Sequence, residues 1–248
     1  MGVKFEFLGT SDTGGIPLVG CYCAVCAKAR DEGTHNRSTC AYLKLDDGSV
    51  ILFDAGYDHL CEIFNTTTIR AIFLTHFHAD HCLGLIRLRK SPTPIVCYIP
   101  DDAQGFGDLF AHKDNIQYRV LAPFERVSIE GIEIIPIPLE HSKPTQGYGV
   151  FTCKSSLAYL TDCASIPPAS FRFLKEKRIE HFFIDACYTP EFSSQKHLNW
   201  ESASEYIETV EAKNGYLIHA SCKTLLPLHV KKIRLKYPYI TQGFSVEI

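Results

Sequence analysis

Three histidines and an aspartate lie within six positions, in the segment T-H-F-H-A-D-H at residues 75–81. A packed core would exclude so many polar side chains, so the segment needs another explanation. In an extended backbone His76 and His78, two residues apart, point to the same side. Asp80 and His81 follow where a helix is predicted to begin, and a turn there would direct the two pairs at two different ions. Because imidazole and carboxylate ligands suit zinc, iron or manganese, the pattern predicts a metal site rather than a solvated, pH-sensitive loop.

Further candidate ligands follow predicted strands elsewhere in the chain. His141, Asp162 and His219 each stand just past the end of an apolar run, as His76 does. Strand ends are where a rigid scaffold presents functional side chains on loops. The sequence therefore predicts one metal site that is assembled from distant segments.

A second group of candidate ligands is the C-x-C-x-x-C cluster at residues 21–26. Cys21, Cys23 and Cys26 have the spacing of a tetrahedral thiolate zinc site that needs one more ligand. The alternative is three unrelated buried thiols. The chain has 11 cysteines, and its first 15 residues contain no apolar export signal. We therefore expect a cytoplasmic protein with reduced thiols rather than a disulfide framework.

The composition limits the function classes. A net charge of −3 gives no strong electrostatic footprint for nucleic acid or an anionic membrane. The longest apolar runs are strand-sized, so no membrane-spanning segment is expected. A chain of 248 residues, 46% of them hydrophobic, can bury a sizeable core as one large domain or two small ones.

Many short strand patterns occur, with helical patterns between and after them. Strands are predicted at 3–8, 41–45, 50–53, 71–75, 95–99, 119–121, 126–129, 132–138, 147–153, 157–160, 181–185, 216–219 and 243–246. Helices are predicted at 58–64, 81–88, 107–112, 168–177, 200–212 and 227–237. This succession favours two sheets covered by helices.

The histidine motif and its surroundings resemble the metallo-β-lactamase superfamily. The motif is preceded by L-F-D-A-G at 52–56, and L-E-H-S-K, L-T-D-C and L-I-H-A-S follow in the expected order. The resemblance implies an α/β (α+β) fold, a four-layer αββα sandwich, formed by a single domain over residues 1–248 with a zinc-binding loop near 21–26. Within the superfamily the chain is most similar to the PhnP-type phosphodiesterase of the carbon–phosphorus lyase pathway. The matching segments are G-T at 9–10, G-x-P at 15–17, G-C-x-C-x-x-C at 20–26, D-L-F-x-H at 108–112 and L-x-H-S-K-x-T-x-G-Y at 139–148.

The resemblance also assigns roles to individual residues. It implies two divalent ions, manganese or zinc, of which the first is bound by His76, His78 and His141, the second by Asp80, His81 and His219, and both by a bridging Asp162. Asp80, Asp162 and His197 are the implied catalytic side chains. Asp54 would brace the cluster, although a turn cap after a buried strand explains that residue equally well.

Two assignments depend on positions outside the histidine motif. His197 precedes the helix predicted from Trp200, where a helix N-terminus favours anions, so it could bind a phosphate or protonate a leaving oxygen. A solvated loop histidine is the alternative. The resemblance further implies a structural zinc held by the cysteine cluster. Its fourth ligand would be Cys222, at a position where the family has a histidine. Lys143 and Tyr148 could contact substrate, but side chains of this kind usually do not.

The function implied by the resemblance is hydrolysis of a small cyclic phosphate. The expected substrate is 5-phosphoribosyl 1,2-cyclic phosphate, which would be opened to ribose 1,5-bisphosphate, with 2′,3′-cyclic nucleotides as surrogates. A tRNA 3′-processing nuclease shares the motifs, but the mild acidity of the chain argues against a bulky polyanionic substrate. A non-catalytic metal-dependent sensor on the same fold is a further alternative, which the complete ligand set disfavours. The expected partner is the small substrate alone, with a homodimer left open.

Overall fold

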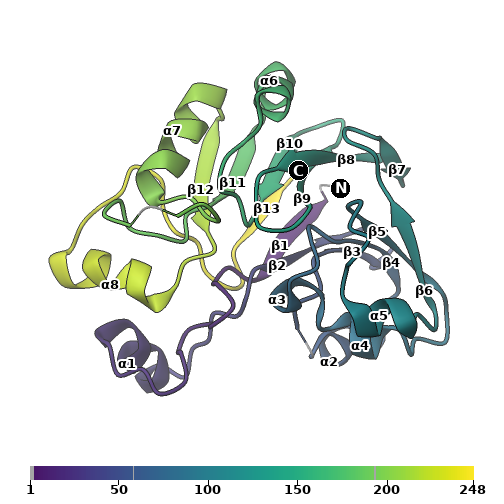
Figure 1. Ribbon diagram of the computed structural model, residues 1–248, viewed down its shortest axis with the longest axis horizontal. Coiled ribbons are helices and arrows are strands. Elements are labelled where there is room, and N and C mark those ends of the chain that lie inside the picture. Colours follow the sequence, from purple (N-terminus) through teal and green to yellow (C-terminus); the bar gives the residue numbers. More distant parts are fainter. Residues whose placement is uncertain (1–2, 58, 193) are drawn as a thin grey trace.

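The computed structural model describes residues 3–57, 59–192 and 194–248. Within them two β-sheets pack face to face, with helices on their outer faces (Figure 1). The first sheet has the order β13 (Ser245–Glu247), β1 (Lys4–Gly9), β2 (Cys40–Lys44), β3 (Val50–Phe53), β4 (Ile69–Phe73), β5 (Ile95–Ile99) and β6 (Ile116–Val120). The second has the order β12 (Asn214–Ile218), β11 (His181–Asp185), β10 (Ser156–Leu160), β9 (Thr145–Phe151), β8 (Ile132–Leu139) and β7 (Val127–Ile129).

Aromatic side chains from both sheets form the central core. Phe5 and Phe53 of the first sheet pack against Phe183 and Tyr148 of the second, with ring centroids 6.0 Å and 5.9 Å apart. Taken together, these strands are rich in aromatic and β-branched residues, which suit a pleated, buried surface. One continuous core therefore joins the two sheets.

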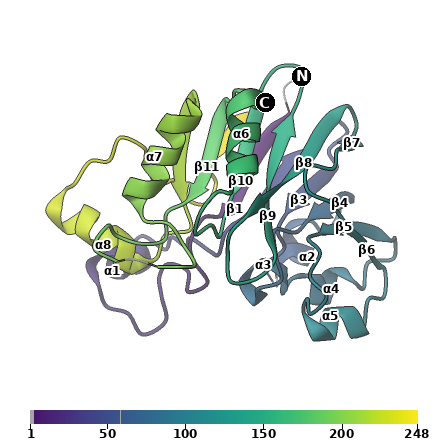
Figure 2. The same cartoon turned by 45° about the horizontal axis from the view of Figure 1, so that its top comes forward.

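Helices complete the outer layers. The outer face of the first sheet is covered by α2 (Leu60–Ile63), α4 (Leu85–Leu88) and α5 (Gly107–Ala111), through an apolar cluster that includes strand and helix residues. The second sheet is covered by α6 (Pro168–Lys177) and α7 (Trp200–Val210). Figure 2 shows these two groups of helices on opposite sides of the paired sheets. The predicted αββα sandwich is confirmed.

Two predicted helices were wrong in their extent. The helix predicted at 81–88 is two short helices, α3 (Ala79–Cys82) and α4. The break falls at Gly84, where a Cβ atom would lie 2.0 Å from the Tyr57 carbonyl oxygen. The helix predicted at 227–237 is α8 (Cys222–Lys231). It begins earlier because the Ser221 side chain caps it by accepting a hydrogen bond from Thr224 N.

The helix predicted at 58–64 begins at residue 58, which lies outside the described residues, and α2 forms the described part of it. One helix was missed altogether, α1 (Ala24–Asp31), which packs against α8 beside the sandwich (Figure 1). No described helix has the length and apolar character needed to cross a membrane.

Candidate metal-dependent active site

The chain directions of the strands explain why the predicted ligands meet. β3 and β4 are parallel neighbours in one sheet, and β10, β11 and β12 are parallel neighbours in the other. β8 runs in the same direction as β10 because each is antiparallel to β9. Within each sheet the carboxyl ends of these strands therefore lie at one edge, and the 3.6 Å distance between His76 Nε2 and Asp162 Oδ2 shows that the two edges meet. Ligands of α/β proteins commonly bind at such edges. All seven predicted active-site ligands lie there, next to one another.

Asp162 stands at the centre of this group, and its two carboxylate oxygens face different partners. Oδ1 lies 3.1 Å from His81 Nε2 and 3.0 Å from His219 Nε2. Oδ2 lies 3.6 Å from His76 Nε2 and 3.6 Å from His141 Nε2. The side chain thus separates two sets of ring nitrogens and adjoins both.

The ligand atoms form two groups, each compact enough for one ion. In the first group His78 Nδ1 lies 2.8 Å from His76 Nε2 and 3.3 Å from His141 Nε2. The ligand atoms of these three histidines and Asp162 all lie within 4.8 Å of one another. The second group, Asp80, His81 and His219, meets the same limit. Convergent nitrogen and carboxylate donors of this kind suit zinc or manganese.

Buried nitrogens without hydrogen-bond partners test whether metal ions fit these groups. His81 Nε2 and both ring nitrogens of His219 are buried and have no such partner among the described residues. Orphaned buried polar atoms are rare in folded proteins and need an explanation. Each Nε2 faces Asp162, where a divalent cation would use its lone pair. The donor set therefore fits the metals that the motif predicts.

Asp54 fixes the orientation of His81. Its Oδ2 lies 3.0 Å from His81 Nδ1 and accepts a hydrogen bond of 2.9 Å from the Tyr159 hydroxyl. Its Oδ1 accepts hydrogen bonds of 2.8 Å from the backbone N–H and the hydroxyl of Thr75. With Nδ1 donating to Asp54, Nε2 of His81 faces the metal group, where it can bind an ion once its proton is displaced. His141 is oriented in the same manner, because its Nδ1 donates to the Lys196 carbonyl oxygen at 2.7 Å.

Burial and neighbouring charges shift the pKa values of the residues in the metal-free cluster. Burial alone would raise the pKa of Asp162, but the nearby His219 and His81 hold it well below its usual value. Burial and the neighbouring His81 lower the pKa of His76 well below that of an ordinary histidine. Burial would also lower the pKa of His81, yet the carboxylates of Asp162 and Asp54 raise it well above the usual value. An ionised Asp162 and a neutral His76 are the states in which these groups bind metals.

His197 lies beside the two ligand groups. It is held there by Asp185, which the sequence analysis did not identify. Its Nδ1 lies 2.7 Å from Oδ2 of Asp185, a fully buried carboxylate at the end of β11. Asp185 also accepts hydrogen bonds from Cys163 N at 2.8 Å and Cys187 N at 2.9 Å. Burial opposes protonation of His197, but Asp185 raises its pKa to about 9 in the metal-free protein. Asp185 lies at a strand end, near which the other site residues were identified, so this position is the signal that could have revealed it.

The ring of His197 packs among the predicted ligands. It stacks on His219 with centroids 5.0 Å apart and an interplanar angle of 15°. It meets His141 edge-on, also at 5.0 Å. His197 therefore lies among the predicted ligands, with a side chain only 14% exposed, and not in a solvated loop.

Lys143 and Tyr148, which were considered as possible substrate contacts, bond to groups outside the two ligand groups. Lys143 Nζ donates to the Gly105 carbonyl oxygen at 3.2 Å and lies 3.4 Å from Asp102 Oδ2. Tyr148 is fully buried and donates its hydroxyl to the Leu74 carbonyl oxygen at 2.7 Å. Both have the structural roles that are usual for such residues.

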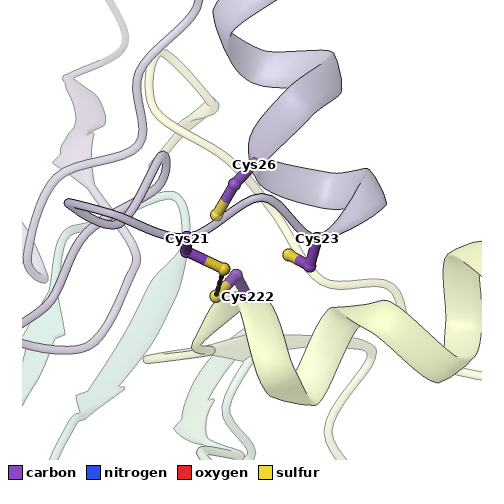
Figure 3. Close-up of side chains that lie close together, drawn as sticks. All are labelled: Cys21, Cys23, Cys26 and Cys222. Carbon is purple, nitrogen blue, oxygen red and sulfur yellow. Dashed lines mark hydrogen bonds between the residues drawn. The ribbon is translucent and has the colours of Figure 1, made fainter.

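The four predicted zinc-binding thiols also meet. Figure 3 shows Cys21, Cys23, Cys26 and Cys222 with their sulfur atoms turned toward one another, and these atoms lie within 4.8 Å of each other. Cys21 Sγ and Cys222 Sγ are 3.9 Å apart although 201 residues separate them in sequence. Four convergent thiols fit a tetrahedral zinc ion.

The cysteine cluster lies between two helix N-termini. Cys23 is the residue before α1, and Cys222 is the first residue of α8. Helix N-termini stabilise negative charge, and therefore thiolates. Hydrogen bonds from the backbone and side chain of Cys23 lower the pKa of Cys21 to about 7. Burial instead raises the pKa of the Cys26 and Cys222 thiols, so in the metal-free cluster the surroundings favour the thiolate form at Cys21 alone.

A comparison with protein families identifies the superfamily. The family model described as the beta-lactamase superfamily domain matches residues 49–220, more than half of the chain. The chain belongs to the beta-lactamase superfamily. The matched segment contains all seven predicted active-site ligands.

Individual relatives agree with this assignment. The chain is 27% identical over 266 residues to an octanoyltransferase of Porphyromonas gingivalis, with 96% of this chain and 49% of that protein covered. It is 30% identical over 133 residues to ribonuclease Z of Methanosarcina acetivorans, with 47% of this chain and 44% of that protein covered. The chain thus spans about half the length of these curated relatives or less. Among solved structures, a diphosphatase from the PhnP family superposes with a TM-score of 0.82 at 24% identity, covering 100% of this chain and 98% of that one. This last likeness shows a shared fold.

The cysteine cluster lies outside the segment that defines the superfamily. The matched residues end at 220, whereas Cys21, Cys23, Cys26 and Cys222 lie before or after them. The four thiols join the N-terminal loop to the beginning of α8. In this superfamily member they form a second candidate site, attached to the edge that carries the first.

Proposed function

We propose that this chain is a phosphodiesterase that uses two divalent metal ions, manganese or zinc. The observation that carries the proposal is the position of Asp162, whose two carboxylate oxygens face two separate ligand groups. Each ligand group would hold one ion, and the two ions would stabilise the charge on the attacking and leaving oxygens of an in-line displacement at phosphorus. Membership of a superfamily that includes hydrolases with this motif supports the proposal.

The chain's own side chains have defined tasks in this reaction. When bound, the two ions supply Lewis-acid polarisation and a water of lowered pKa. Asp54 and the Lys196 carbonyl hold His81 and His141 in the tautomers that leave Nε2 free. Asp185 holds the His197 ring by Nδ1, so Nε2 can give a proton to the departing oxygen. Asp80 completes the second ligand group, where its carboxylate lies 3.5 Å from His81 Nε2.

The substrate that we propose is a small cyclic phosphate. The two named forms are 5-phosphoribosyl 1,2-cyclic phosphate, whose opening gives ribose 1,5-bisphosphate, and a nucleoside 2′,3′-cyclic phosphate. The similarity to a PhnP-family diphosphatase over the full length supports a small phosphate ester. The net charge of −3 provides no extended basic surface for a polymer.

A second candidate is cleavage of tRNA at its 3′ end. The relative from Methanosarcina acetivorans is named ribonuclease Z, and it aligns with 47% of this chain. The acidic net charge makes this candidate weaker than the first. Octanoyl transfer is not adopted, because the relative with that name is aligned over only 49% of its length.

A hydrolysis panel with the manganese- or zinc-loaded protein separates these candidates. The substrates are 5-phosphoribosyl 1,2-cyclic phosphate, 2′,3′-cyclic AMP, a nitrophenyl phosphodiester, a lactone and a precursor tRNA. We expect turnover of the cyclic phosphates and the nitrophenyl ester, with none for the lactone or the tRNA. The Asp162→Ala protein, purified in parallel, controls for contaminating enzymes. Hydrolysis of the lactone alone would contradict the proposal.

A further inference from the structure

A row of aromatic rings leads from the protein surface to the candidate active site. Phe192 packs on Tyr188 with ring centroids 4.6 Å apart. Tyr188 meets His197 edge-on at 5.8 Å, and His197 stacks on the predicted ligand His219 at 5.0 Å. Tyr188 therefore stands directly beside the residue proposed to serve the substrate, and Phe192 packs on Tyr188; the two are here named the aromatic pair.

The aromatic pair offers an accessible ring at a fixed position. Phe192 is 56% exposed although its side chain is large and apolar, and Tyr188 is partly buried. The backbone of Tyr188 is held at both groups, because its N–H donates to the Leu198 carbonyl oxygen and its carbonyl accepts from Trp200 N, each at 3.2 Å. A single exposed apolar residue needs no explanation. An exposed ring that packs at 39° against an anchored ring, at the edge of an active site, is a surface on which a flat group can stack.

A cavity of about 240 Å³ adjoins Tyr188, the inner ring of the aromatic pair. Its lining includes Cys187 next to Tyr188, Asp12 from the N-terminal loop, and Ser221, Cys222 and Lys223 at the start of α8. It borders the active site, because Cys187 Sγ lies within 4.8 Å of ring nitrogens of His197 and His219. Pockets for drug-sized ligands measure about 300–1,000 Å³, so this cavity suits one small ring system.

The charges that line the cavity distinguish two kinds of occupant. Lys223 brings one positive charge and Asp12 one negative charge. A second phosphate of the substrate would meet the Asp12 carboxylate as well as Lys223, without the paired basic side chains that recognise phosphate well. A neutral planar group would meet no such repulsion, and the aromatic pair would supply its contact surface.

We propose that the aromatic pair and its cavity bind the nucleobase of the substrate. The inference rests on the proposed phosphodiesterase function and names its substrate class: a nucleoside cyclic phosphate rather than a sugar phosphate without a base. Stacking of a base on an aromatic side chain tolerates different bases, because every base has a flat face. We therefore expect little preference among the bases and a clear preference for having one.

The test compares two substrates that differ only in the base. These are 2′,3′-cyclic AMP and 1-deoxyribose 2,3-cyclic phosphate, with the metal-loaded protein. In the wild type the base-free substrate should have a KM about 5–20-fold higher at similar kcat, the lower part of the range for base stacking because Phe192 is exposed. Phe192→Leu should raise KM for cyclic AMP toward that of the base-free substrate and leave the latter unchanged. Phe192→Tyr, which keeps a ring, should preserve the preference.

A binding measurement makes the result independent of turnover. Calorimetry with adenosine 2′-phosphate and the matching base-free phosphate should show the same preference and the same loss in Phe192→Leu. Equal affinities in the wild type, or an equal effect of Phe192→Leu on both ligands, would overturn the inference while leaving phosphodiesterase activity intact. If neither cyclic phosphate is hydrolysed, the proposed function fails, and the calorimetry still decides whether the aromatic pair binds a base.

Discussion

At the scale of single residues, three residues of the candidate site have a left-handed backbone. Asp54, Asp162 and His219 follow the ends of β3, β10 and β12 with φ angles of 64°, 54° and 66°. Non-glycine residues held in sparsely populated backbone regions cost about 1–3 kcal/mol each and persist only where surrounding contacts determine them. Here the left-handed turn lets each chain segment leave its strand and still direct its side chain at the common edge. We interpret this strain as part of the construction of the site.

Asp162 provides the first test at this scale. Asp162→Asn keeps the shape of the side chain, and Asn tolerates the left-handed backbone, but the variant loses the charge that faces both groups. We expect turnover to fall by two orders of magnitude or more and metal content to fall below two active-site ions per chain, as read by elemental analysis. Asp162→Ala should lose at least as much. Turnover close to that of the wild type with both ions retained would contradict the two-ion assignment.

His197 and Asp185 provide the second test. His197→Ala should keep both active-site ions and lose about 10²–10⁴-fold in kcat, the usual size of an acid–base contribution. Asp185→Asn removes the charge that orients the ring, so it should reproduce part of that loss, also with normal metal content. In the double variant the two effects should not add, because both act through one ring. Loss of metal in His197→Ala would show instead that His197 is a ligand.

At the scale of elements, α1 shows why the sequence did not predict every helix. It has eight residues and no side-chain cap at its N-terminus. Helices this short are marginal by themselves, so packing against α8 and the cysteine cluster must stabilise α1. The spacing of the three cysteines predicted the thiol cluster. It did not predict that helix α1 follows Cys23. By contrast, α6 was predicted at its observed bounds, because Pro168 at its first position marks its start.

Cys222 tests whether the thiols hold a zinc ion that joins these elements. Cys222→Ser should release about one tightly bound zinc per chain, lower the melting temperature and weaken the active site indirectly, because His219 lies three residues before it. Loss of such support commonly costs about 10–100-fold in metal affinity or activity. Cys222→His should largely restore zinc content, melting temperature and activity, since imidazole is an equally good zinc ligand.

Cys97 offers a matched control for the Cys222 variants. It is a buried thiol in β5, within the apolar cluster beneath α2 and α4 and outside the group of four thiols. Cys97→Ser should alter stability without changing zinc content. Equal zinc content and equal melting in the wild type and Cys222→Ser would leave Cys222 as an ordinary buried thiol.

At the scale of the whole molecule, the sequence predicted the ligands better than their arrangement. Residue types and strand-end positions identified the seven ligands, and the family resemblance implied their division into two groups, but only the structure gives the distances from Asp162 to each group. Asp185 was missed because it reads as the last residue of a buried strand, and its partner His197 is 12 residues away. The aromatic pair carries no motif, because stacking requires a position in space and no particular spacing in sequence.

The layered architecture also predicts how the protein responds to metal removal. The active-site ligands occupy one edge of the sandwich, whereas the aromatic core between the sheets contains none of them. A mild chelator that strips the active-site ions should therefore abolish hydrolysis and leave the near-ultraviolet circular dichroism almost unchanged. The melting temperature should still fall, because ions bound only by the folded state stabilise it in proportion to RT ln(1 + [M]/Kd), and their removal leaves buried nitrogens without partners. Adding back manganese or zinc should restore activity and melting together. Unfolding of the chain on mild chelation would show that the site, and not the core, holds the two sheets together.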